Sequence, residues 1–227
     1  MKSYRGHLGK IKNASQAHQS YYNAAGQRVP GTTTITGVLD KPALPYWANT
    51  IGLQGIAIRD FVDSLAQIGK CGHYLVECYY RGTKPDLGTY TGDQIELAKV
   101  CLKKFFDWQD ENHFEPLEIE LDLVSEQHQY GGRLDLYGIL HGKKTLLDIK
   151  TSKAIYPEHF TQVAGGYRRL ARENGMEVED VRILRIGRDD KEGFECLGIS
   201  PALTEVHDEL FLLCRKIYEL KKKVNKK

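Results

Sequence analysis

Upstream of Pro116 the apolar residues follow helical spacing. Residues 46–81 predict a long helical stretch with a break near Gly69, and residues 93–113 predict another helix that is capped by Asp93. Downstream of Pro116 the period changes to two, which is the period of a strand. The chain is therefore expected to place a helical part before a sheet.

The first 30 residues show no clear period. A short hairpin is expected in the stretch YYNAAGQRVP, where Asn and Gly favour a turn. The following stretch, PGTTTITGVLD, predicts a short helix that is capped by Thr32 or Thr33.

Alternation is clearest in LEIELDLVS, residues 117–125. Its apolar side chains fall on one face and its acidic side chains on the other, which predicts a half-buried strand. The same period continues in GRLDLYGIL and KTLLDIKTS, which are joined by a turn, HGKK, of hairpin length. The two faces of the first strand are Leu117, Ile119, Leu121 and Leu123 against Glu118, Glu120 and Asp122.

The remaining third of the chain mixes both periods. Residues 157–174 predict a helix with Pro157 in its first turn and Gly175 at its end, VRILRIGR and FECLGIS predict two strands, and residues 201–222 predict a last helix. This order favours an α/β fold, with a mixed central sheet flanked by helices and an N-terminal helical part. We expect a single domain, 1–227, with a mainly helical part at 1–115, a sheet core at 116–200 and a C-terminal helix with a basic tail at 201–227.

Composition is that of a globular protein. The 227 residues are 41% hydrophobic and 27% charged, and the formal net charge is +2. The last seven residues, KKKVNKK, supply five positive charges, so the rest of the chain is slightly acidic. Overall charge therefore does not identify a nucleic-acid-binding protein, although a local basic patch could still bind one.

The lack of a recognisable targeting signal and the spacing of the cysteines lead us to expect an intracellular protein. The sequence has no apolar run of roughly 18 residues, and its polar amino terminus lacks the apolar core of a signal peptide. The five cysteines are widely spaced without a CxxC pair, which favours free thiols over a zinc site or a disulfide framework. We expect a cytoplasmic protein, of phage or bacterial origin, with no membrane partner.

Three charged residues interrupt the apolar pattern of the central strands. Asp148 and Lys150 share one face of their strand, and a hairpin would bring Asp135 to the same side. Two close carboxylates repel each other unless a cation lies between them, and Mg²⁺ or Mn²⁺ suits such oxygen ligands. A nearby lysine can orient water or stabilise developing negative charge, as metal-assisted phosphodiester hydrolysis requires. The alternative is a surface hairpin with a salt bridge.

The sequence here resembles the PD-(D/E)XK nuclease superfamily. Its GxxD element is similar to GRLD, which ends at Asp135, and its DxK element is similar to DIK, residues 148–150. The resemblance is to the branch of RecB-like, Cas4-like and phage exonucleases, which includes a mitochondrial genome-maintenance exonuclease. It implies a restriction-endonuclease-like core and metal ligation by His73 of GKCGHYLVECYYRG, Glu120 and the Ile149 carbonyl. Without the resemblance, His73 would be interpreted as a core histidine, and Glu120 as a solvated strand residue.

That branch also carries QxxxY on the helix after DxK, and this chain departs from the pattern. In QVAGGY, Tyr167 follows Gln162 by five residues, which turns it about 140° away in a regular α-helix. Arg169 would return to within about 20° of Gln162 and could share its face toward DNA. A helix distortion at Gly165-Gly166 would instead restore the Gln–Tyr alignment.

The resemblance implies a Mg²⁺- or Mn²⁺-dependent DNA exonuclease of phage-type recombination, replication or repair. Some members of the branch hold an iron–sulfur cluster, but only Cys196 and Cys214 lie in the relevant region, so no cluster is expected. The expected partners are DNA, single-stranded or with a free end, and a single-strand annealing or binding protein; the sequence leaves the oligomeric state open. The candidate site is catalytic Asp135, Asp148, Lys150 and Gln162, metal-binding His73, Glu120, Asp135, Asp148 and Ile149, and DNA-binding Arg133, Lys153, Tyr167 and Arg169.

Two other functions remain open at this stage. A structure- or sequence-specific endonuclease, of restriction or Holliday-junction type, would use the same chemistry without needing a DNA end. A non-catalytic DNA-binding subunit would keep the fold, but it has no physical reason to keep all three of Asp135, Asp148 and Lys150. The helical stretch before the first core strand favours the exonuclease, because it could wall a channel for one DNA strand.

Overall fold

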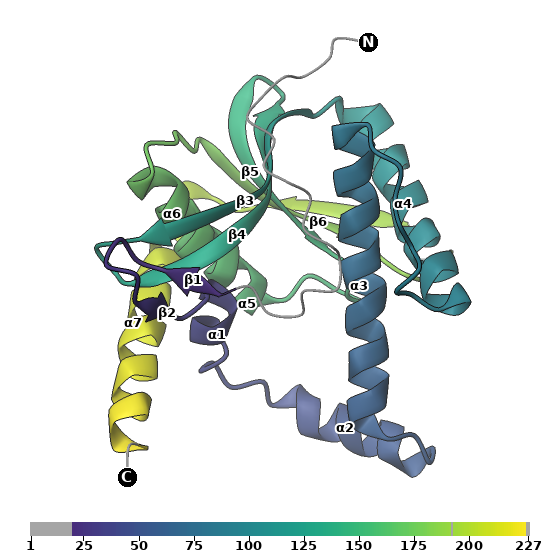
Figure 1. The fold of residues 1–227 in the computed structure, drawn as a ribbon, viewed down its shortest axis with the longest axis horizontal. Coiled ribbons are helices and arrows are strands. Elements are labelled where there is room, and N and C mark those ends of the chain that lie inside the picture. The colour runs from purple at the N-terminus through teal and green to yellow at the C-terminus, as the bar shows by residue number, and fades with distance from the viewer. Residues whose placement is uncertain (1–19, 192, 226–227) are drawn as a thin grey trace.

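A five-stranded mixed sheet forms the centre of the part of the chain that the computed structural model describes, residues 20–191 and 193–225. The strand order is β3-β4-β5-β6-β7; β5 and β6 are parallel and the other neighbours are antiparallel (Figure 1). This is the mixed sheet flanked by helices that the sequence predicts. The strands are β3 Glu115–Ser125, β4 Tyr130–Leu140, β5 Lys143–Lys150, β6 Asp180–Ile186 and β7 Phe194–Gly198.

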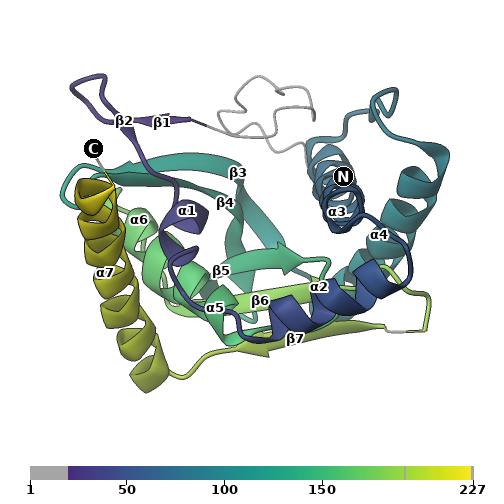
Figure 2. The same ribbon diagram turned by 90° about the horizontal axis from the view of Figure 1, so that it is seen from below.

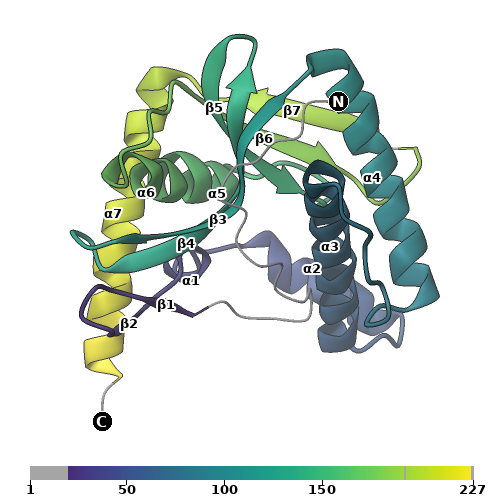
Figure 3. The same ribbon diagram turned by 45° about the horizontal axis from the view of Figure 1, so that its top comes forward.

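Helices cover both faces of this sheet. Helices α3 and α4 pack on one face, while α5, η1, α6 and α7 pack on the other, as Figures 1 and 3 show. None of the helices in the described residues is long and apolar enough to cross a membrane. The helices are α1 Thr32–Thr36, α2 Ala43–Leu53, α3 Ile58–Arg81, α4 Gly92–Asn112, α5 Pro157–Phe160, the π-helix η1 Thr161–Tyr167, α6 Arg168–Glu173 and α7 Pro201–Val224.

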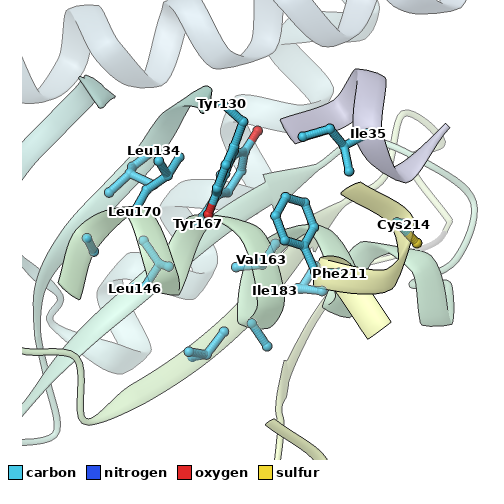
Figure 4. Packing of buried hydrophobic residues seen from close by; sticks show 13 residues of the cluster. Ile35, Tyr130, Leu134, Leu146, Val163, Tyr167, Leu170, Ile183, Phe211 and Cys214 are labelled. Carbon is cyan, nitrogen blue, oxygen red and sulfur yellow. The ribbon is translucent and has the colours of Figure 1, made fainter. Parts of the chain in front are cut away.

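The alternation along β5 divides the core between the two faces. Leu146 joins the apolar cluster under η1 and α7, whereas Leu147 and Ile149 join the cluster under α3 and α4. Figure 4 shows the first of these clusters, in which Tyr130 and Phe211 lie against each other. Because Asp148 and Lys150 alternate with Leu147 and Ile149, they face the η1 side, as the strand period requires.

The N-terminal hairpin is confirmed, but the predicted threonine cap is wrong. Strands β1 Tyr21–Tyr22 and β2 Arg28–Val29 pair antiparallel. Gly31 occupies the N-cap of α1 and no side chain caps it. Thr32 lies within the helix, where its hydroxyl donates to the carbonyl of Gly131 at 3.0 Å and so ties α1 to the sheet.

The break in the long helical stretch lies at Gly55 and not at Gly69. Gly55 has a φ of +74°, a left-handed conformation that glycine adopts easily, and it separates α2 from α3. Gly69 lies inside α3, which continues through it without a break. A side chain there would place a Cβ 3.0 Å from the hydroxyl of Thr151. The glycine is needed for the close approach of α3 to the end of β5.

The cap of α4 also differs from the prediction. Thr91, and not Asp93, is the N-cap: its hydroxyl accepts from the backbone N–H of Gln94, whose side chain accepts from the Thr91 N–H. This capping box satisfies two orphan donors, so it prevails over a single acidic side chain in the first turn. Asp93 lies within that first turn.

Strand β3 does not alternate as regularly as its sequence does. A bulge between Pro116 and Glu118 leaves Leu117 exposed, where a buried position was predicted. Further along, Ile119 packs in the cluster under α3 and α4, whereas Leu121 and Leu123 pack in the cluster under η1 and α7. The prediction of a single face for all four apolar residues is therefore wrong. The bulge displaces Leu117, and the positive φ of Glu120 interrupts the alternation between Ile119 and Leu121.

The predicted turn between β4 and β5 is confirmed. Its central residues, His141 and Gly142, both have positive φ, at 48° and 76°. Those are the angles of the two-residue hairpin turn whose twist matches that of the strands. The turn fixes the register in which Leu136 lies opposite Leu147.

Two glycines let the helix after β5 approach its neighbours closely. A Cβ on Gly165 would lie 2.4 Å from the His207 carbonyl of α7, and one on Gly166 would lie 2.3 Å from the Thr32 side chain. The helix predicted for 157–174 is accordingly present as three consecutive pieces, of which the middle one, η1, is a π-helix.

Gly165→Ala is expected to lower the free energy of unfolding by about 1–3 kcal/mol, because the added methyl group meets backbone that cannot easily move. Gly52→Ala in α2 is the matched control: apart from its chain neighbours and the backbone of its own helix, no described atom lies within 4 Å of an added Cβ, so the better helix propensity of alanine should raise stability by up to about 1 kcal/mol. Urea unfolding of both variants measures the difference. Equal stability of Gly165→Ala and wild type would contradict the close packing of η1 on α7.

Candidate active site

The candidate site opens where β4 and β5 separate. Their pairing ends at Leu136 opposite Leu147, so Asp135 and Asp148 lie just beyond the last pair. Asp135 Oδ2 there accepts the backbone N–H of Ile149 at 2.7 Å. A carboxylate thus takes the place of a strand carbonyl, and the two acidic side chains come close together.

A pocket of about 500 Å³ lies at this opening. It is bounded by α3, by the ends of β4 and β5, by the helix that follows β5 and by Arg188, two residues after β6. Figure 3 shows how α3 and the α5–η1 helix flank this end of the strands. The lining residues are Val62, Leu65, Ala66, His73, Asp135, Asp148, Ile149, Lys150, Thr151, Ser152, His159, Gln162, Tyr167 and Arg188.

Three of the predicted ligands form a cluster at the β4 side of this pocket. One donor atom each from His73, Glu120 and Asp135 lies within 4.8 Å of the others. The Nδ1 atom of His73 is 3.6 Å from Asp135 Oδ2 and 3.8 Å from Glu120 Oε1. Glu120 has a φ of +52°, which is unfavourable for a residue with a side chain. This backbone turn places its carboxylate beside the histidine and not in solvent.

The electrostatics of the cluster favour a cation. Burial lowers the pKa of His73, but the carboxylates of Asp135 and Glu120 outweigh burial and raise it to about 9. Burial also raises the pKa of Asp135, as does the neighbouring charge of Glu120. The imidazole is therefore protonated at neutral pH. A metal ion bound between the carboxylates and the imidazole would displace this proton and supply the positive charge in its place.

On β5 the buried Asp148 forms an ion pair with the half-buried Lys150 at the pocket. Lys150 Nζ lies 2.5 Å from Asp148 Oδ2, and Asp148 is only 2% exposed. That oxygen makes no hydrogen bond of good geometry within the described residues. The interpretation as a solvent-exposed, salt-bridged hairpin is therefore wrong.

Burial and pairing act in opposite directions on this ion pair. Burial raises the pKa of Asp148 to about 6, against the opposing effect of Lys150. Burial lowers the pKa of Lys150, but Asp148 and Asp135 raise it by more, so the amine stays protonated. Both groups are charged at neutral pH. Asp148 Oδ2 can therefore accept a hydrogen bond from a further donor or bind a cation.

The π-helix brings Gln162 and Tyr167 together. Gln162 Nε2 donates to the Tyr167 hydroxyl at 2.7 Å, and both side chains line the pocket. A π-helix pairs residue i with residue i+5, so five residues of separation replace the four of an α-helix. The predicted distortion at Gly165-Gly166 is confirmed. Burial raises the pKa of Tyr167 well above its ordinary value, so it remains a neutral phenol.

Three of the predicted DNA-binding residues lie outside the pocket. Arg169 does not share a face with Gln162, because the π-helix changes the rotation between them; its guanidinium instead donates to Asp208 on α7. Arg133 makes two hydrogen bonds to Asp122, at 2.7 and 2.8 Å, and lies 3.8 Å from Glu120. Lys153 is exposed on the segment after β5.

The sequence patterns missed four polar pocket residues: Thr151, Ser152, His159 and Arg188. Arg188 lies two residues beyond the end of β6, at the edge of the sheet where the carboxyl ends of the parallel strands β5 and β6 meet, and it donates to the Leu65 carbonyl at 3.3 Å. A basic residue close after a strand that follows a helical crossover from β5 is the signal that could have found it. His159 has no comparable signal. Burial and then the charge of Lys150 lower its pKa to about 4.

The donor set suits a divalent cation. Carboxylate oxygens are ligands for Mg²⁺ and Mn²⁺, and an imidazole nitrogen adds preference for the softer of the two. His73, Asp135 and Asp148, from α3, β4 and β5, line the pocket, and Glu120 from β3 joins His73 and Asp135 in the cluster beside it.

No protein-family model matches this sequence, and no curated protein matches it. Among solved structures, the chain is similar to an alkaline exonuclease, LHK-Exo, from Laribacter hongkongensis, with 15% identity over 86% of this chain and 93% of that chain and a TM-score of 0.38. The structure of LHK-Exo in complex with dAMP is similar to the same degree, with 15% identity over 87% of this chain and 94% of that chain and a TM-score of 0.38.

Proposed function

We propose that this chain is a divalent-metal-dependent DNA exonuclease built as a single domain. The observation that supports it best is the convergence of Asp135, Asp148 and Lys150 in one pocket, beside the cluster of His73 and Glu120. Two carboxylates, an imidazole and a half-buried ammonium group are the parts that phosphodiester hydrolysis with a bound Mg²⁺ or Mn²⁺ requires. A role in phage-type recombination, replication or repair, beside a single-strand annealing or binding protein, belongs to this proposal.

Each polar residue of the pocket has a part in the proposed reaction. His73, Glu120, Asp135 and Asp148 would hold the cation, with the Ile149 carbonyl as a further ligand. When bound, the cation supplies a water of lowered pKa and neutralises phosphate charge. The Lys150 ammonium group would orient the attacking water and stabilise the charge that develops on the phosphate.

Gln162 and the residues around it would position the substrate strand. The Tyr167 hydroxyl fixes the Gln162 amide, which leaves the amide oxygen able to accept from a water or a sugar. Arg188 and the hydroxyl of Thr151 line the same pocket and suit phosphate oxygens, whereas the Ser152 hydroxyl donates to the Ala154 carbonyl at 2.7 Å. Lys153 and Arg133, outside it, are proposed to contact the DNA backbone further along.

His73→Ala is expected to weaken Mn²⁺ binding more than DNA binding, since it removes a nitrogen ligand and leaves the substrate-positioning residues in place. Activity should be partly recovered at high Mn²⁺. Calorimetric titration with Mn²⁺ and binding of a fluorescent oligonucleotide measure the two affinities. If metal affinity is unchanged and only the melting temperature falls, His73 is a core residue and not a ligand.

A pair of glutamates on β3 provides a control for the metal centre. Glu120 lies beside His73, whereas Glu118, two residues away, is exposed. We expect Glu120→Gln to reduce Mn²⁺ affinity and Glu118→Gln to leave it unchanged. Equal effects of the two changes would contradict the assignment of Glu120, and an absence of Mn²⁺ binding in the unmodified protein would favour a non-catalytic DNA-binding subunit.

Cleavage is expected to require a free DNA end. The test compares a linear oligonucleotide with the same sequence closed into a circle, as single strand and as duplex, in Mg²⁺ and in Mn²⁺. Degradation of the linear DNA alone is the expected result, and the Asp148→Asn variant serves as the blank for contaminating nucleases. Comparable cutting of closed circles would favour the endonuclease, with the same residues in the metal centre.

A further inference from the structure

Helix α7 carries apolar residues on two of its faces. Its inner face buries Thr204, Phe211 and Cys214 against η1 and the sheet. Its outer face exposes six large apolar side chains, each between 46% and 81% exposed. These six residues, which we call the α7 stripe, are Leu203, Val206, Leu213, Ile217, Leu220 and Val224.

The α7 stripe has the spacing of a helix-pairing surface. Together with the half-buried Leu210, its members follow one another at intervals of three and four residues along the whole 24-residue helix. This is the spacing that keeps an apolar seam facing a second helix. Exposed apolar residues that are scattered singly are normal on a monomer, whereas a contiguous exposed apolar patch marks an interaction site.

Charge on α7 is distributed unevenly along its length. Glu209, in the N-terminal half, flanks the stripe on the same side as Lys216 in the C-terminal half, one heptad later. Lys221, Lys222 and Lys223 follow at the C-terminal end. A partner helix running antiparallel would therefore bring acidic charge opposite basic charge, and the two helix dipoles would also oppose each other favourably.

We infer that the α7 stripe is the interface of a homodimer in which α7 pairs antiparallel with α7 of a second copy. A two-fold axis near Leu213 would place Val206 opposite Leu220 of the partner subunit, and Glu209 opposite Lys216 of the partner subunit, each contact occurring twice. A parallel pair would instead place Lys216 next to the partner subunit's Lys221, which is repulsive. The charges therefore select the antiparallel arrangement.

The proposed dimer leaves both candidate active sites open. Helix α7 lies at one side of the molecule and α3, which walls the pocket, at the other, as Figures 1 and 2 show. The π-helix η1 lies between α7 and the pocket, packing on Phe211 and presenting Gln162 and Tyr167 on its other side. The inference is therefore independent of the proposed function.

The first test is the molar mass of the full chain in solution. Light scattering after gel filtration, from low micromolar to several hundred micromolar protein, should show a mass that rises from 25.8 kDa toward twice that value. Leu213→Glu, which places two like charges opposite each other at the axis, should remain monomeric at every concentration with an unchanged circular dichroism spectrum. Leu53→Glu, at an apolar position on α2 that is also exposed (81% against 50% for Leu213), should dimerise like wild type. A monomeric wild type, or a dimeric Leu213→Glu, would overturn the inference.

The second test addresses the orientation. Glu209→Lys and Lys216→Glu should each weaken the dimer by about tenfold, because each creates two repulsive pairs. The double variant, Glu209→Lys with Lys216→Glu, should recover wild-type dimerisation, since both opposite-charge pairs are restored with reversed sign. If the single variants weaken the dimer and the double variant does not recover it, the antiparallel pairing is wrong.

Discussion

Asp148→Asn is expected to abolish cleavage in Mg²⁺, with a loss of at least about 10³-fold in kcat. The substitution keeps the shape of a side chain that is 2% exposed, but it removes the negative charge at the point where a cation would be held. It also leaves the Lys150 ammonium group without its nearest counterion. Both changes reduce transition-state stabilisation and neither creates a cavity.

The control for this variant is Asp180→Asn. Asp180 begins β6, at the end of the strand opposite to the pocket, and pairs with Arg182. It should keep wild-type turnover, and circular dichroism should show both variants folded. Near-normal turnover of Asp148→Asn in Mg²⁺ would mean that the candidate active site is wrong.

Lys150→Ala is expected to lower kcat by about 10² to 10³ and to change DNA affinity much less. The half-buried Lys150 ammonium group is proposed to act on the water and on charge that develops in the transition state, so its contribution should be larger there than in the ground state. Lys153→Ala offers the contrast. This exposed lysine is three residues away and should alter KM and its salt dependence while leaving kcat nearly unchanged.

Single-turnover kinetics and a separate DNA-binding titration would distinguish the two lysines. An effect of Lys150→Ala on KM alone would reassign Lys150 to phosphate binding. A fall in kcat for Lys153→Ala of the same size as for Lys150→Ala would show that the two lysines are not functionally distinct.

The central strands could be predicted because local sequence and tertiary structure agree there. Alternation fixed the faces of Asp148 and Lys150, and the hairpin turn at His141-Gly142 fixed the register that brings Asp135 close to them. Strand alternation alone did not predict the position of Glu120 beside His73, since it depends on a positive φ that no neighbouring glycine signals; only the resemblance pointed to Glu120 as a ligand.

Other features could not be predicted from the sequence, because they depend on contacts with residues far away along the chain. Gly69 was read as a helix breaker, although its role is to let α3 approach Thr151. Arg169 was assigned to DNA because the helix was taken as regular, whereas Asp208 on α7 binds it. The α7 stripe could not be distinguished from a core-facing pattern until the structure showed which face of that helix is buried.

An insertion into a helix normally rotates every later side chain by about 100° relative to the earlier ones. In η1 the turn of the π-helix is wider than that of an α-helix and accommodates a separation of five residues between Gln162 and Tyr167 in place of four. The Gln162 Nε2 and Tyr167 hydroxyl therefore still meet at 2.7 Å. Homologous helices of different length can therefore carry the same pair. An alignment of this chain with a sequence that carries the same pair four residues apart should accordingly allow a one-residue gap between Gln162 and Tyr167, and search patterns of fixed spacing would not detect this pair.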